Sequence, residues 1–217
     1  MRAAIFLALA LCGVQTAVAS PPTPITSPGE MSMNAVQNFL WPVLKSAGKK
    51  GRIYYEAICP PAKDHRPAFP PLEVRPPVTS ATTPAAVRSI FRNEKGVSVA
   101  EDPSGIIRVR IGRVPDAVLR TPISTLSLDP IEQYNPLAAI GAIENAPEVR
   151  SAMAKLHLAV PVSVINMPVA RPAEGLRHLP PELSNVTMDQ ALDMVARTWD
   201  YIVFYGACTE PGIYEIF

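Results

Sequence analysis

The chain has 217 residues, of which 20 are basic and 19 acidic, and 48% of them are hydrophobic. This near-neutral balance gives no electrostatic basis for binding nucleic acid or an anionic membrane surface, so we expect no nucleic-acid partner. The hydrophobic content is sufficient for the core of one domain or two small ones, and the 25 prolines predict long loops.

The first residues have the pattern of a cleavable secretory signal peptide. Arg2 supplies a positive charge, residues 3–14 are apolar apart from one glycine, and Ala17-Val18-Ala19 is the small-residue sequence that precedes cleavage. We predict cleavage between Ala19 and Ser20, and a periplasmic or secreted protein. An uncleaved anchor would need roughly 20 apolar residues, more than this run provides. We also expect no transmembrane segment in the mature chain, because no later stretch is long and apolar enough.

The first part of the mature chain predicts a helix and a strand, followed by a long loop. Residues 20–31 are polar and rich in proline, which predicts a flexible leader before a folded body at 32–217. We expect the first helix over 33–47, with a kink or break at Pro42. Residues 51–59 alternate in side-chain character and predict a strand. The closely spaced prolines of 60–77 predict a loop, within which 72–74 is an alternative short edge strand.

The middle of the chain predicts a helix followed by a β-hairpin. Thr83-Pro84 is a typical helix start, because threonine caps free N–H groups and proline suits the first turn. Gly96 ends this helix. A turn sequence at 102–105 then separates two predicted strands. The elements expected from the hairpin onward are strands at 97–100 and 107–111, a short helix at 115–119 and a strand at 123–128.

The last third of the chain predicts a pair of helices and a terminal αβ unit. Asn135-Pro136 and Ala146-Pro147 repeat the helix-start pattern. Thr187 and Gln190 form a capping box that begins the last helix. The other expected elements are a strand at 160–165, a proline-rich connection at 168–181, and strands at 201–207 and 213–217 separated by Pro211-Gly212.

These elements together predict an α+β fold with small mixed sheets, packed helices and long proline-rich loops. Division of the body into two similar αβ modules, 83–128 and 185–217, is compatible with this order. Aromatic residues concentrate in the first and last predicted strands, at Tyr54, Tyr55, Phe204 and Tyr205 among others. They predict a core shared by neighbouring strands, the alternative being an exposed binding patch.

Cys59 and Cys208 are the two cysteines that remain after cleavage, since Cys12 lies in the signal peptide. In an oxidising compartment such a pair predicts a disulfide bond, here between the first strand and the last hairpin. The bond would close a long loop and stabilise the fold by about 3–5 kcal/mol in the chain-entropy description. Two independent buried thiols are the alternative.

Two runs resemble a known family. The sequence GIIRVRIGRVPDAVL at 105–119, with the helix before it, and the sequence NVTMDQALDMVARTWDYIVFYG at 185–206 are similar to the short αβ periplasmic modules of secretins and TonB-dependent receptors. The resemblance implies a small α+β interaction fold in a cell-envelope setting. Because the shared pattern consists mostly of apolar spacing, it implies no role for any individual residue. The barrel, pore and plug domain of that family have no counterpart here.

The sequence holds no motif of an enzyme active site, a metal site or a cofactor site. The histidines, His65, His157 and His178, lie far apart, and neither H-E-x-x-H nor C-x-x-C occurs. No nucleophile elbow or phosphate-binding glycine loop is present. The adjacent acids Glu101 and Asp102 precede a turn, where acidic residues are ordinary. We therefore predict no catalytic, cofactor-binding or metal-ligating residue, and no cofactor.

The leading functional hypothesis is a non-enzymatic protein-interaction or assembly module of the bacterial cell envelope, whose partner is another envelope protein. A secreted enzyme with a site built from loops around Glu101, His65 or His178 is one alternative, and a carrier of a small ligand is another. An open edge strand or apolar patch would favour binding, a cleft that joins those three residues would favour the enzyme, and an empty apolar cavity would favour the carrier.

Overall fold

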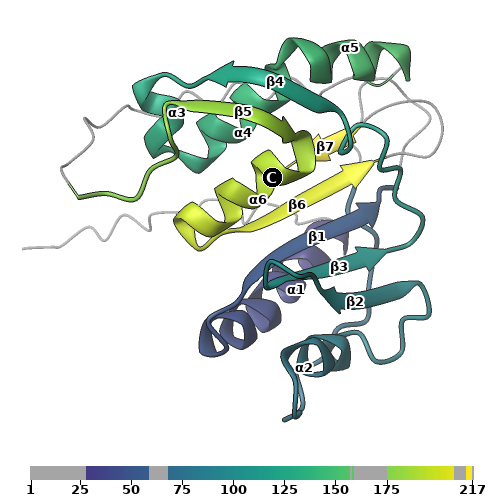
Figure 1. Ribbon diagram of the computed structural model, residues 1–217. Coiled ribbons are helices and arrows are strands. Elements are labelled where there is room, and N and C mark those ends of the chain that lie inside the picture. Colours follow the sequence, from purple (N-terminus) through teal and green to yellow (C-terminus); the bar gives the residue numbers. More distant parts are fainter. Residues whose placement is uncertain (1–27, 59–67, 157, 159–174, 208–213, 217) are drawn as a thin grey trace, which may run out of the picture.

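The computed structural model describes residues 28–58, 68–156, 158, 175–207 and 214–216. It has an α+β fold in which helices pack on both faces of a mixed sheet with strand order β2-β3-β1-β6-β7, while β4 and β5 form a second, two-stranded sheet (Figure 1). The predicted fold class is confirmed. Within the described ranges, no helix is both long and apolar enough to cross a membrane. The predicted signal peptide and its Ala19–Ser20 cleavage site lie outside these ranges.

The main sheet is built around β1 (Lys50–Glu56), which pairs in parallel with β3 (Ile106–Ile111) on one side and β6 (Ile202–Ala207) on the other. The edge strands β2 (Val97–Glu101) and β7 (Tyr214–Ile216) pair antiparallel with β3 and β6. The strand pairing of both predicted hairpins is therefore confirmed, while the predicted turn at Pro211-Gly212 lies outside the described residues. One strand from each of the two runs 83–128 and 185–217 flanks β1 in this sheet.

Alternate side chains of β1 enter two separate hydrophobic cores. Ile53 and Tyr55 lie in the core formed with α1 (Pro28–Ser46) and α2 (Thr83–Ile90), whereas Tyr54 lies in the core on the side of α6 (Met188–Trp199). The strand is buried on both faces, as is typical of a parallel strand covered by helices. The Tyr54 and Tyr205 rings lie 6.4 Å apart, which confirms that aromatic residues of the first and last long strands share a core.

Helix α1 begins at Pro28 rather than after residue 31, so the predicted leader is too long at its carboxyl end. A proline is favourable in the first turn, where its missing N–H costs nothing. The helix continues through Pro42, so of the predicted kink or break, the break is wrong. It ends in a Schellman motif: Gly48 has φ +63°, its N–H donates to Lys45 O at 3.2 Å, and Lys49 N–H donates to Leu44 O at 2.9 Å.

Helix α6 begins as the capping box predicts, because Gln190 N–H donates to Thr187 Oγ1 at 3.2 Å and Thr187 N–H to Gln190 Oε1 at 2.8 Å. The predicted helix pair is also confirmed. On this side of the sheet α6 contacts α4 (Pro136–Asn145) and β5 (Glu182–Thr187). Around these two elements pack β4 (Pro122–Ser127), α3 (Pro130–Tyr134) and α5 (Pro147–Lys155).

Several local predictions are wrong. Residues 115–119 form a turn region rather than a helix, because the carbonyls of Leu119 and Thr121 accept N–H groups from the start of α6. Residues 72–74 form no strand, since the segment instead bonds to side chains such as Ser32 and to the end of α2. The helix cap predicted at Thr83 is Thr82. Strand β5 and helix α3 were absent from the sequence prediction, and the strand predicted at 160–165 lies outside the described residues.

Candidate functional site

Strand β2 is an edge whose outward backbone groups have no partner in the part of the chain that the structure describes. Gly112 N–H donates to Gly96 O at 2.9 Å, and Asp102 N–H donates to Ile106 O at 3.0 Å, at the two ends of the β2–β3 ladder. Hydrogen-bonded pairs alternate along an antiparallel ladder. The even-numbered residues therefore bond to β3, while Val97, Val99 and Glu101 direct their N–H and C=O groups away from the sheet.

Strand β4 of the small sheet differs from β2, because a side chain bonds to one of its outward backbone groups. At β4, the N–H of Ser124 donates to Glu148 Oε1 at 3.1 Å, and the Ser124 hydroxyl donates to the same oxygen. Glu148 belongs to α5, which packs alongside this strand. A side chain from a neighbouring helix thus accepts the hydrogen bond of an outward N–H of β4, and such covering is a common way to prevent pairing with another strand. No comparable contact reaches β2 from the described residues.

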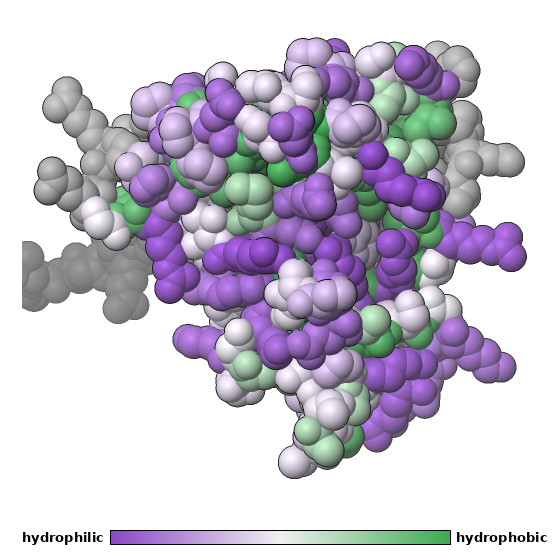
Figure 2. All heavy atoms as spheres, viewed as in Figure 1, coloured by the Kyte–Doolittle hydropathy of each residue, from purple (hydrophilic) through white to green (hydrophobic). Residues whose placement is uncertain are grey.

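The two faces of β2 differ in chemistry. Val97 and Val99 pack with the core beneath α2, whereas Ser98 and Ala100 are exposed on the opposite face. On that side, helix α6 packs against β1 and β6. Figure 2 shows hydrophilic side chains gathered across the middle of the molecule, where β1 and β3 lie in Figure 1. A strand added to β2 would therefore have one apolar side and one polar side.

The polar region beside β2 contains a buried charge cluster that joins the sheet to α6. The Arg52 side chain of β1 is fully buried, and it donates from Nη1 to Asp193 Oδ1 at 2.6 Å and from Nη2 to Asp189 Oδ1 at 3.0 Å. Arg108 of β3 donates to Asp193 Oδ2 at 2.6 Å and to Asp189 Oδ2 at 3.1 Å. Two arginines of the sheet thus form ion pairs with two aspartates that lie one helical turn apart on α6.

Tyr54 completes the cluster between these charges. Its hydroxyl donates to Asp189 Oδ1 at 2.9 Å, and the guanidinium carbons of Arg52 and Arg110 lie 5.1 and 4.8 Å from its ring centroid. Burial raises the pKa of the Tyr54 phenol well above its ordinary value, so the hydroxyl stays protonated as a donor. Arg110 interacts through this ring and forms no ion pair with a described carboxylate.

Asp102 connects the same cluster to the β2–β3 turn. Its Oδ1 accepts the N–H groups of Ser104 at 2.9 Å and Ile106 at 3.0 Å, and its Oδ2 accepts Arg108 Nε at 2.8 Å. Partial burial by itself would raise the pKa of Asp102, but the Ser104 and Ile106 bonds and the Arg108 charge hold it below its ordinary value. The ionised carboxylate therefore fixes the turn at the end of β2.

The contacts of this cluster join α6 to the main sheet. Each carboxylate of α6 accepts hydrogen bonds from both arginines. Burial raises the pKa of Asp193, and the nearby charges of Arg52 and Arg108 oppose that rise. Arg52 Nε is buried without a hydrogen-bond partner among the described atoms, which reduces the free energy of folding gained by the cluster. The cluster holds α6 over β1 and β3, and α6 does not cover β2.

The residues singled out from the sequence do not meet in one cleft. Glu101 forms an ion pair with Lys49 at 2.5 Å, whereas His178 lies against the Tyr134 ring with centroids 4.9 Å apart. His65 and His157 lie outside the described residues. Within those that the structure describes, no group of three histidine, cysteine or acidic side chains could hold a metal ion.

Cys59 and Cys208 also lie outside the described residues, and their disulfide bond stays a prediction. The strands that lead to them are neighbours: Ala57 N–H donates to Ala207 O at 3.0 Å, at the shared carboxyl ends of β1 and β6. Sequence reasoning missed Arg52, Asp189 and Asp193. Two aspartates at positions i and i+4, beside the apolar residues of a predicted helix, were the signal that could have indicated a buried ionic contact.

Comparison with protein families, with characterised proteins and with solved structures found no match to this chain.

Proposed function

We propose that the protein is a non-enzymatic protein-interaction module of the bacterial cell envelope, which binds an extended segment of a partner protein along β2. The open edge of β2 is the observation that supports this function. Val97, Val99 and Glu101 offer N–H and C=O groups that an added strand would pair, the mode of recognition known as β-augmentation. The envelope setting depends on the predicted signal peptide and on the resemblance to secretin and TonB-receptor modules.

The free energy of the hydrogen bonds that β2 can form determines how tightly a partner strand is expected to bind. Three N–H and three C=O groups allow six hydrogen bonds, worth together about 3–9 kcal/mol at about 0.5–1.5 kcal/mol each. Association costs about 4–15 kcal/mol before any contact is counted. Backbone pairing alone therefore gives weak binding, and contacts of the partner's side chains with Ser98, Val99 and Ala100 would decide which segment binds.

A photo-crosslinker placed in β2 tests the proposal directly. p-Benzoylphenylalanine replaces Ser98, an exposed residue of β2, and in a control protein it replaces Ser151, an exposed residue of α5. After irradiation with envelope extract, we expect an adduct from position 98 and none from position 151. Mass spectrometry of the cross-linked peptide should place the contact in an extended segment of one partner.

Two substitutions at Val99 show whether the adduct depends on backbone pairing. Val99→Pro removes an outward N–H and places a ring where the added strand would lie, yet it breaks no bond within the sheet. Val99→Thr keeps the N–H and the β-branched shape. The adduct should persist in V99T and disappear in V99P, with both variants unfolding at similar temperatures. An adduct that survives V99P, or the same adduct from position 151, would overturn the proposal.

A further inference from the structure

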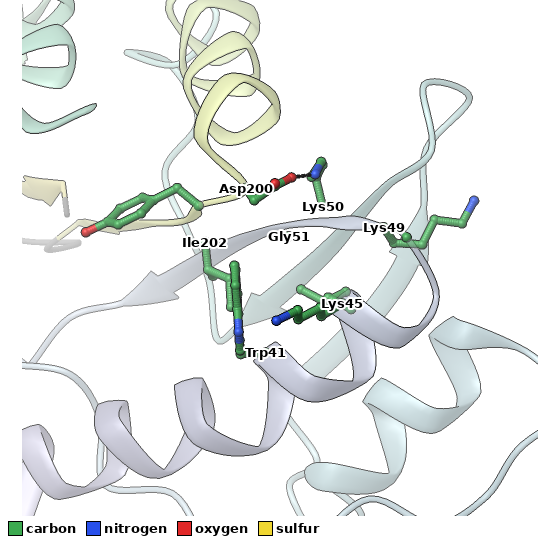
Figure 3. A pocket seen from close by; sticks show the side chains of 10 residues that line it. Trp41, Lys45, Lys49, Lys50, Gly51, Asp200 and Ile202 are labelled. Atoms are coloured by element: carbon green, nitrogen blue, oxygen red, sulfur yellow. Dashed lines mark ion pairs between the residues drawn. The ribbon is translucent and has the colours of Figure 1, made fainter. Parts of the chain in front are cut away.

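A pocket of about 240 Å³ lies at the amino-terminal ends of β1 and β6. The end of α1, the Gly48–Lys49 turn and the turn between α6 and β6 enclose it. Figure 3 shows the Trp41 indole beside Ile202, and Lys45 extended toward Trp41. Its volume is below the range of about 300–1,000 Å³ that is usual for sites of drug-sized ligands, so it suits a small molecule.

The pocket has an apolar wall with one flat aromatic face. Trp41 is 39% exposed although it is one of the largest apolar side chains of α1, while Leu44 of the same helix is buried. Ile202, at the start of β6, forms the facing part of the wall. An aromatic ring placed against an indole gains both apolar burial and ring–ring attraction.

One cation of the pocket has no acidic partner among the residues that the structure describes. Lys49 is paired with Glu101 at 2.5 Å, and Lys50 is paired with Asp200, which also contacts Arg177. Lys45 forms no ion pair with any described residue. Its ammonium is also not needed as a cap, because the last carbonyls of α1 accept the N–H groups of the Schellman motif.

The charges around the pocket favour an anion. Lys45, Lys49, Lys50 and Arg177 carry four positive charges, and Asp200 and Glu101 carry two negative ones, which leaves a formal charge of +2. The carboxyl ends of α1 and α6 oppose this by about half a negative charge each. The sum stays positive by about one charge. Burial, and to a smaller extent the charge of Arg177, lowers the pKa of Lys50.

We propose that this pocket binds a small aromatic carboxylate, with its ring between Trp41 and Ile202 and its carboxylate on the Lys45 ammonium. The Lys49–Glu101 ion pair connects the pocket to the end of β2, but the ring site at Trp41 and Ile202 and the Lys45 ammonium lie on other elements, so the two proposals are tested by different residues. The wall supplies apolar contact for a flat ring, and a charge-assisted hydrogen bond to Lys45 selects the acid over a neutral molecule of the same shape.

The probe for this site is 3-phenylpropionate, and its neutral control is 3-phenylpropionamide. The indole N–H resonance of Trp41 is followed by ¹H–¹⁵N NMR and assigned with Trp41→Phe, while that of Trp199 in α6 serves as an internal reference. We expect the acid to shift the Trp41 resonance in a saturable manner and the amide to bind at least about tenfold more weakly, as for loss of a charged hydrogen bond. The Trp199 resonance should move little.

Lys45→Met should weaken binding of the acid by about tenfold while leaving the weak binding of the amide unchanged. The matched control is Lys95→Met, which removes an exposed lysine before β2 that does not line the pocket. Equal affinity for acid and amide would overturn the proposal. So would an effect of K45M no larger than that of K95M, or the absence of a saturable Trp41 shift at millimolar acid.

Discussion

Truncation of Asp193 to alanine should destabilise the protein by about 3 kcal/mol. The substitution removes the acceptor of two hydrogen bonds of 2.6 Å, one from Arg52 and one from Arg108. Breaking a buried ion pair costs about 3–5 kcal/mol, and two features place this case at the lower end. Arg108 is 21% exposed and can regain water, and Arg52 keeps its bonds to Asp189. Arg52 itself is 0% exposed and cannot rehydrate without moving.

Urea unfolding followed by circular dichroism measures this loss. With a slope of about 1–3 kcal/mol per molar urea, a loss of about 3 kcal/mol lowers the midpoint by about 1–3 M. Asp116→Ala is the matched control, because it removes the partner of Arg120 in an exposed pair of the same kind. That control should change stability by no more than about 0.5 kcal/mol.

A double replacement separates an unpaired charge from simple loss of packing. Arg52→Met combined with Asp193→Leu removes the buried charge together with one of its partners, and it should recover most of the stability lost in Asp193→Ala. A midpoint for D193A equal to that of D116A would refute the view that the cluster anchors α6. A double variant less stable than D193A would show that the polar contacts matter in themselves.

Three further changes probe other parts of the fold. Gly206→Ala should destabilise the protein by about 1–3 kcal/mol, because the added Cβ would lie 2.2 Å from Tyr55 Cζ. Gly141→Ala in α4 should stabilise it by about 0.5–1 kcal/mol, because no atom lies within 4 Å of the added Cβ. Equal midpoints of thermal unfolding for the two variants would contradict the expected close contact at Gly206. Because the pKa of Asp102 is lowered in the folded state, its contribution to stability is present above its unfolded pKa of about 3.9 and is lost as the pH falls through the lower folded value. The urea midpoints at pH 7 and pH 3 should therefore differ less in Asp102→Asn than in the wild type. An identical pH dependence would argue against the carboxylate as the anchor of the turn. Alkylation of the denatured, unreduced protein should find no free thiol at Cys59 or Cys208, and two alkylated cysteines would rule out the predicted disulfide bond.

The elements that sequence predicted well are those whose signals are local. Thr187 and Gln190 lie three residues apart and begin α6 by bonding to each other, so no distant contact is needed to recognise this start. The β2–β3 hairpin is equally local, because Asp102 bonds to groups within its own turn. Strand β5 was missed because its partner β4 lies far away in the sequence and Asn185, at φ +53°, interrupts its pattern.

The charge cluster could not be located for a related reason. In an alternating strand, an arginine such as Arg52 predicts a face exposed to solvent, since arginine is seldom buried without a partner. Its partners are on α6, well over a hundred residues later, and only the parallel pairing of β1 with β3 and β6 brings the sheet's arginines under that helix. Tertiary contact therefore decided which of two alternating faces became polar and buried.

The same long-range pairing decides which strand of the hairpin is exposed at the edge. Because β3 pairs with β1, β2 has no neighbour on its outer side among the described strands. Edge strands are commonly protected by being short, by charges or by covering side chains. Glu148 protects β4 in this way, whereas β2 is limited by its length of five residues and by the charged Glu101 at its end, with Gly96 before it and the Asp102 turn after it. Such a strand is too short to favour indiscriminate sheet extension, yet it presents three outward residues, enough to hold one extended segment whose side chains add the remaining affinity. The contrast between the two edges of one small protein favours recognition over protection at β2.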